Sequence, residues 1–325
     1  MDIRAEITDS IVRLIESSQA APGGWVRPWQ RLAVQGLPAN RATGKAYQGI
    51  NVLALLGATL GRGYLVNEWL TYNQALSLGG HVRKGEHATR CVIFKPRTPD
   101  HSGKAGRGAG RGEAGEADSA ARSGGLFAAA FALFNVAQCD GLPAHAHDAP
   151  AALARPADSH AAADALIAAS GARIRHGSNA AFYARQADEI VLPSADRFGR
   201  AADYYATALH ELIHWTGAPS RLDREFGKRF GDDAYAMEEL VAELGAAFTC
   251  AALGVDGHAL DNHAAYVASW LRLAKADSQA VFTAASAAHK AHEYLMGLMQ
   301  ADAGGEVAGE VVEVAEVVEE LALAA

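Results

Sequence analysis

The stretch ALHELIHWTG, residues 208–217, places two histidines four positions apart in an apolar run. Its apolar residues recur at helical spacing, which predicts a helix that ends at Gly217. Residues four apart share one helix face, so His210 and His214 can bind the same metal ion. Glu211 lies about 100° around the helix, where a base can act on a water held by that ion. The alternative is an ordinary helix face that carries two histidines.

A second helical run, AMEELVAELG at residues 236–245, supplies a candidate third ligand. Its acids need partners, because an unpaired buried carboxylate is costly. We expect Glu239 to bind the metal and Glu243, on the same face, to hydrogen-bond a ligating histidine; the exchange of these two roles remains open. Glu238 is expected to be a surface or accessory group. Two histidines and one glutamate leave a fourth position open, which is typical of catalytic zinc, and manganese is the alternative ion. Glu211 is then the expected general base.

The chain has 325 residues, which is too long for one ordinary core and predicts two domains. A run rich in glycine, alanine and charge at residues 99–125 is expected to be a flexible insertion. We expect a first domain at residues 1–145, a linker at 146–160, a second domain at 161–300 and an acidic tail at 301–325.

Hydrophobic periodicity predicts an α+β fold, with a small N-terminal α+β module and a mainly helical second domain. An amphipathic helix is expected at the N-terminus, with Ile3, Ile7 and Ile11 on one face. A buried helix begins near Asn51, TYNQALSLGG forms a short helix, and HATRCVIFKP forms a strand that Pro96 ends. The segment LFAAAFALFN is expected to pair with this strand.

Charge divides unevenly between the two halves, although the net charge is −8. Residues 1–145 carry 16 Lys and Arg against 11 Asp and Glu, a net of +5, whereas residues 146–325 carry 13 against 26, a net of −13. The halves are therefore expected to have different partners. The three cysteines form no CxxC pair, which argues against a disulfide framework and favours a reducing cytoplasm. Charges within the N-terminal helix exclude a signal peptide there, and no membrane partner is expected.

The first domain interleaves aromatic side chains with cations and amides. A protein that binds single-stranded nucleic acid needs aromatic side chains on which the bases stack and cations that contact the phosphate backbone. Core aromatics and solvated charges produce the same composition and are the alternative interpretation. The candidate DNA contacts are Trp25, Arg27, Trp29, Asn40, Arg41, Lys45, Tyr47, Asn51, Trp69, Tyr72, Arg83 and Lys84.

Several of these segments together resemble a known family. WVRPWQ, LPANRATGKAYQGINVLAL, WLTYNQALSLGGHVRKGEHATRCVIFKP and LFNVAQCDGLP resemble the N-terminal domain shared by ArdC-type antirestriction proteins and TraC-type plasmid primases. HELIHWTGAPSRLDREFGKRFGDDAYAMEELVAELGAAF resembles the zincin-like metallopeptidase domain that follows it in ArdC. The resemblance implies binding of single-stranded DNA, protection of conjugative DNA from host restriction, and a metal-dependent peptidase fold. It does not identify a protein substrate.

Two other functions remain open. The chain could be a DNA escort whose metal site is only structural. It could also be a zinc metallopeptidase whose N-terminal domain recruits protein rather than DNA. The priming activity of TraC-type proteins is not expected, because no primase domain follows.

Overall fold

The structure is a computed structural model, and it describes residues 3–19, 28–30, 32, 35–96, 126–144, 159–225, 233–257 and 264–302. Among these described residues, the N-terminal unit shows two sheets and three α-helices. A four-stranded sheet has the order β1-β2-β5-β4, with β1 and β2 parallel and the other pairs antiparallel, and β3 pairs with β6. The elements are α1 (Ile3–Gln19), η1 (Pro28–Gln30), β1 (Ala39–Asn40), α3 (Ile50–Arg62), β2 (Glu68–Leu70), α4 (Tyr72–Ser77), β3 (His81–Val82), β4 (Thr89–Pro96), β5 (Leu126–Asn135), η2 (Val136–Gln138) and β6 (Cys139–Asp140).

The second unit is mainly helical. Its three-stranded sheet has the order β7-β9-β8, with β7 parallel and β8 antiparallel to the central strand. The elements are α5 (Ser159–Ser170), β7 (Arg173–His176), β8 (Phe182–Ala184), β9 (Glu189–Leu192), η4 (Ala195–Arg197), α6 (Ala201–Thr216), α7 (Asp233–Leu253), α8 (Ala264–Ala276) and α9 (Ser278–Asp302).

Local sequence signals explain several element ends. Thr71 accepts a hydrogen bond from the backbone N–H of Gln74, and the Gln74 side chain accepts one from the N–H of Thr71, so a capping box starts α4. The helix α3 ends at Gly63, whose φ of 70° lies in the left-handed region that glycine adopts without strain.

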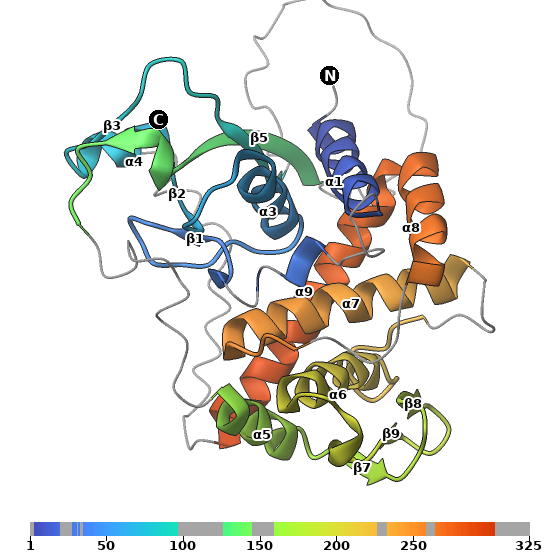
Figure 1. The fold of residues 1–325 in the computed structure, drawn as a ribbon. Helices are drawn as coiled ribbons and strands as arrows, with labels where there is room; N and C mark the ends of the chain where they lie inside the picture. Colours follow the sequence, from blue (N-terminus) through green and yellow to red (C-terminus); the bar gives the residue numbers. More distant parts are fainter. Residues whose placement is uncertain are drawn as a thin grey trace, which may run out of the picture.

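One hydrophobic core connects the two units. Helix α7 crosses the middle of the molecule beside α6 and α9, and α1 packs against α8 and α9 (Figure 1). The buried residues Ile3, Ile7 and Ile11 of α1 therefore share a core with α6 to α9. Trp29 is also buried there, with its ring centroid 6.1 Å from that of Trp270. A smaller core beneath the first sheet contains Leu55, Trp69, Cys91 and Leu133.

The predicted elements are confirmed within the described residues. The N-terminal helix, the helix near Asn51, the short helix after Thr71 and the strand before Pro96 all form, and β4 and β5 pair along their length. The predicted α+β class and two-unit architecture are confirmed as well. The insertion at 99–125, most of the 146–160 linker and nearly all of the acidic tail lie outside the described residues. Among the helices that are described, none has the length and apolar character needed to span a bilayer.

Candidate metal centre

Helix α6 carries the two histidines into the interior. From Ala206 to Thr216 every residue is buried, including His210, Glu211 and His214 at 3%, 3% and 8% exposure. This part of the helix is buried on all sides, so its polar side chains need partners inside the protein. The prediction of a helix ending at Gly217 is confirmed, with the N–H of Gly217 bonded to the carbonyl of His214.

Helix α7 lies against α6 and brings three buried glutamates to it. Close packing is possible because Gly245 faces Ile213, and a Cβ at this glycine would lie 3.0 Å from two Ile213 side-chain carbons. Glu238, Glu239 and Glu243 are 5%, 7% and 4% exposed. The expected surface position of Glu238 is therefore wrong.

The ligand atoms of His210, His214 and Glu239 lie within 4.8 Å of one another, which suits a single metal ion. Nε2 of His214 is 3.6 Å from Oε1 of Glu239, and Nε2 of His210 is 3.9 Å from Oε2 of the same carboxylate. Ligand atoms bound tetrahedrally to one zinc ion at about 2.1 Å lie roughly 3.4 Å apart. The spacing and the N₂O donor set therefore fit zinc, and of the two glutamates left open by sequence, Glu239 faces both histidines.

The second nitrogen of His214 is held by Glu238. Nδ1 lies 3.2 Å from Oε1 of Glu238, which is the orienting carboxylate found beside many metal-binding histidines. Burial by itself lowers the pKa of His214. The hydrogen bond with Glu238 and the charges of Glu239, Glu238 and Glu211 outweigh it and raise the pKa to about 9.

For His214, the orienting role predicted for Glu243 belongs to Glu238. Oε2 of Glu243 instead accepts a hydrogen bond from the indole N–H of Trp29, at 3.2 Å. This bond joins the segment before β1 to α7. A contact of Glu243 with His210 stays a prediction.

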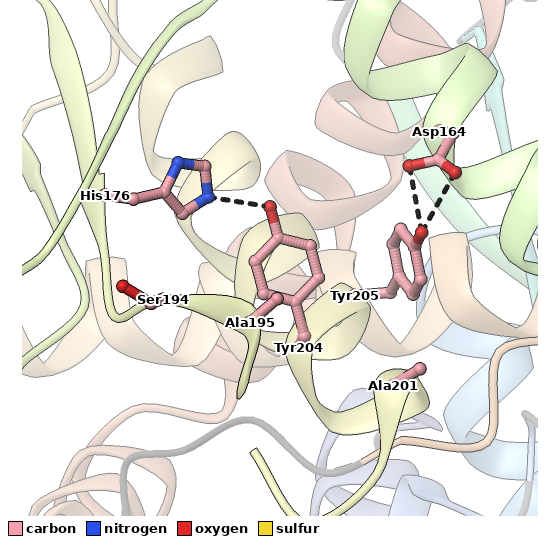
Figure 2. Close-up of a pocket in the computed structure, with 7 residues that line it drawn as sticks. All are labelled: Asp164, His176, Ser194, Ala195, Ala201, Tyr204 and Tyr205. Atoms are coloured by element: carbon pink, nitrogen blue, oxygen red, sulfur yellow. Dashed lines mark hydrogen bonds between the residues drawn. The ribbon is translucent and has the colours of Figure 1, made fainter. Parts of the chain in front are cut away.

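A hollow of about 560 Å³ lies at the start of α6 (Figure 2). Tyr204 Oη is 3.0 Å from Nε2 of His176, and the Tyr205 hydroxyl donates to Asp164 at 2.9 Å. Tyr205 precedes His210 by five residues, about 7.5 Å along the helix axis. The lining residues are Asp164, His176, Ser194, Ala195, Ala201, Tyr204 and Tyr205, so no candidate metal ligand belongs to this hollow.

The candidate DNA contacts separate into groups. Trp25 and Arg27 lie outside the described residues. Trp29 and Trp69 are 2% and 0% exposed, and Arg41 is a buried partner of Glu68 that also donates to the carbonyl of Pro143. We correct these three assignments, because buried rings cannot stack on bases and the Arg41 guanidinium is enclosed by protein acceptors.

Three other candidates hold the fold together. The Asn40 side chain accepts from two backbone N–H groups of the turn that follows it and donates to Tyr47 and Gln74. Burial raises the pKa of the Tyr47 hydroxyl. The side chain of Asn51 pairs with both backbone groups of Val92 in β4. These contacts account for all three residues without DNA.

The remaining candidates are accessible. Lys45, Tyr72 and Lys84 are exposed, and the Tyr72 side chain is the largest of them. Arg83 is partly exposed but is paired with Glu86 and Asp140.

Comparison with known proteins covers both units. The family described as the N-terminal domain of anti-restriction factor ArdC matches residues 1–132, and the zincin-like metallopeptidase family matches residues 161–287. The crystal structure of the antirestriction protein ArdC from R388 plasmid in its Mn(II)-bound form is 36% identical, with a TM-score of 0.72. The match covers 92% of this chain and 98% of that chain. The chain belongs to the ArdC family.

Other relatives of this ArdC-family chain agree. The metal-free ArdC structure matches with a TM-score of 0.73 over 93% of this chain and 99% of that chain. The uncharacterized protein y4eC of Sinorhizobium fredii is 37% identical over 93% of this chain and 94% of its own length. Two Escherichia coli proteins named DNA primase TraC are each 38% identical over 89% of this chain, which spans 27% and 20% of their lengths. The zincin-like family implies zinc, and the solved ArdC relative holds manganese.

Proposed function

We propose that this ArdC-family chain binds single-stranded DNA through its N-terminal unit and carries a metal-dependent peptidase in its second unit. In this proposal the chain protects conjugative DNA that enters a cell from host restriction. The observation that carries the enzymatic part is the buried cluster in which Nε2 atoms of His210 and His214 both face Glu239, with Glu211 on the same helix. The comparison with an antirestriction protein supports the protective role.

The side chains divide the chemistry between them. His210, His214 and Glu239 would hold the ion, which supplies a Lewis acid that polarises a peptide carbonyl. Glu238 holds Nδ1 of His214, so Nε2 is directed at Glu239. Glu211 takes a proton from the attacking water and returns it to the departing amine.

A structural metal site in a DNA escort is the second candidate, and one observation favours it. Glu211 is only 3% exposed, so a peptide reaches this carboxylate only if neighbouring groups move. The hollow in Figure 2 does not provide that access, because its lining includes neither Glu211 nor a ligand.

We place DNA on the α4 surface, defined here as Lys45, Tyr72, Leu76 and Lys84. Tyr72 and Leu76 are 52% and 47% exposed and lie one turn apart on α4, so they form one apolar face. The turn that carries Lys45 is tied to α4 by the bond from Asn40 to Gln74, and β3, which precedes Lys84, packs on the same helix. An exposed aromatic ring on a surface that also carries two cations suits single-stranded DNA.

The DNA proposal is tested with the full chain and labelled oligonucleotides. Wild type should prefer single-stranded to duplex DNA, and rising salt should weaken binding steeply. Tyr72→Ala should weaken binding about 5- to 160-fold, because stacking contributes roughly 1–3 kcal/mol per base. Leu65→Ala is the matched control, since Leu65 is 70% exposed but lies outside the α4 surface. Equal affinity for both DNA forms, or an equal effect of both substitutions, would sink the proposal.

The substitution Glu211→Gln distinguishes a metal-dependent peptidase from a DNA escort whose metal site is only structural. The change keeps the side-chain volume and all three ligands, so metal content and DNA affinity should remain those of wild type. Hydrolysis of a fluorogenic peptide mixture by the metal-loaded chain should fall about 10²- to 10⁴-fold, as expected when a general base is lost. DNA protection is then measured by conjugation into a restricting host. Protection that survives Glu211→Gln intact contradicts a proteolytic basis and favours the escort.

A further inference from the structure

Arg224, in the loop after α6, reaches the carboxylate that orients a candidate metal ligand. Its Nε donates to Oε2 of Glu238 at 3.0 Å, and its Nη2 donates to Oε1 at 2.8 Å. Both side chains are buried, at 10% and 5% exposure. This two-point pairing fixes the plane of the carboxylate, which a single contact would leave free to rotate.

The same guanidinium also holds the end of α6. Nη2 donates to the carbonyl of Ile213 at 2.6 Å, and Nη1 donates to the hydroxyl of Thr216 at 2.7 Å. The last carbonyls of a helix lack partners within the helix, so an arginine that reaches them also anchors the helix end. Arg224 therefore joins the end of α6 to Glu238 on α7.

These contacts converge on His214. Oε1 of Glu238, which accepts from Arg224, is also 3.2 Å from Nδ1 of His214. When Nδ1 carries its proton and donates it to Glu238, the lone pair of Nε2 faces Glu239, 3.6 Å away. The orientation of this ligand is thus set through one carboxylate by one arginine.

We propose that Arg224 is a positioning residue of the metal centre, which through Glu238 holds His214 in the tautomer and ring orientation that bind the ion. The inference rests on the proposed metal site but not on peptidase activity. Without Arg224, the Glu238 carboxylate lies buried next to Glu239 and loses the donors that fix its plane. His214 then loses its defined orientation, and the metal affinity falls.

The test measures metal binding by the full chain. Arg224→Gln should weaken zinc and manganese binding, measured by chelator competition, about 10- to 100-fold, as is typical when a group that orients a ligand is lost. The visible absorption of the cobalt-substituted protein should also change, because it reports ligand geometry. Arg224→Lys keeps the charge but loses the planar guanidinium that donates two hydrogen bonds to one carboxylate. Its metal affinity should therefore lie between those of Arg224→Gln and wild type.

Arg221→Gln is the matched control on the same loop. Arg221 also pairs with a carboxylate at two points, Asp188 at 2.5 and 3.1 Å, and donates to the carbonyl of Trp215 at 2.6 Å. Its guanidinium packs on the Trp215 ring, 3.8 Å from the centroid. Among the described residues, the contacts of Arg221 do not include Glu238. Arg221→Gln should therefore lower thermal stability while leaving metal affinity and the cobalt spectrum unchanged.

Each outcome of the metal-binding test either supports or overturns the role proposed for Arg224. Wild-type affinity and an unchanged cobalt spectrum in Arg224→Gln would overturn the proposal, as would an equal loss of affinity in Arg221→Gln. If Arg224→Gln does not fold, Arg224→Lys carries the test, and wild-type affinity and spectrum in that variant overturn it. A wild-type chain that binds no metal overturns this inference and the metal-dependent part of the proposed function, but not the DNA-binding part. Metal binding that depends on Arg224 without any peptide hydrolysis supports the inference and contradicts the peptidase alone.

Discussion

The glutamates of α7 show that side chains one or a few positions apart on a helix can have entirely different partners. Neighbouring residues on a helix point about 100° apart. Glu239 therefore faces both histidines, Glu238 faces Nδ1 of His214 and Arg224, and Glu243 contacts Trp29. All three carboxylates are buried, but their partners are a candidate metal site, a cation and an indole. Only the first of these partnerships was evident from the HExxH motif and the spacing of the acids.

A pH prediction follows from His292, which is 7% exposed in α9. Burial and, more weakly, the charge of His289 lower its pKa to about 4, whereas Glu293 raises it slightly, and its Nδ1 lies 3.1 Å from the hydroxyl of Thr249 on α7. As pH falls below about 6.5, the unfolded chain takes up a proton that folded His292 rejects. The free energy of unfolding should therefore fall by about 2 kcal/mol from this residue between pH 7 and pH 5.

Urea unfolding of His292→Gln and wild type at both pH values checks this effect. The variant should lose about 2 kcal/mol less than wild type between the two conditions. His81→Gln, at an exposed position in β3, is the control and should behave as wild type. An identical pH dependence in His292→Gln and wild type would show that His292 is not the source.

Between elements, the approach of α6 to α7 decides whether the two parts of the candidate metal centre meet. Gly245 lies opposite Ile213, which sits between the two histidines. Gly245→Ala places a methyl group 3.0 Å from the fully buried Ile213 side chain, so that side chain or its helix must give way by a few tenths of an ångström. We expect a loss of roughly 1–3 kcal/mol in the free energy of unfolding and weaker zinc binding.

The control for this substitution is Gly297→Ala. Gly297 also lies inside a helix, α9, but a Cβ there meets no atom within 4 Å. Alanine should therefore stabilise the protein by about 0.5–1 kcal/mol through helix propensity and leave zinc affinity unchanged. Thermal unfolding and chelator competition measure both variants. Zinc affinity equal to that of wild type in Gly245→Ala contradicts the role of this contact.

For the whole molecule, the shared core predicts that the two units unfold together. The helix α1 packs on α8 and α9, and Trp29 contacts both Trp270 and Glu243. Calorimetry of the full chain should therefore show one transition. Zinc at about 100 times its dissociation constant should raise its midpoint by about 5 °C, because binding stabilises the folded state by roughly 2.7 kcal/mol. Two transitions, of which only one responds to zinc, would contradict this coupling.

The local sequence pattern was sufficient to predict many secondary-structure elements of this protein and part of its candidate metal site. Helical spacing and a C-terminal glycine predicted α6, apolar runs predicted β4 and β5, and the HELIH motif supplied two candidate ligands, because these signals depend on residues within a few turns. The partners of Arg224, the burial of Trp29, Trp69 and Arg41, and the exclusion of the exchanged roles of Glu239 and Glu243 came only from the tertiary structure. These features depend on how helices and strands distant in sequence rotate and pack against one another, and neither an isolated arginine nor an isolated tryptophan carries a local signal of which surface will cover it.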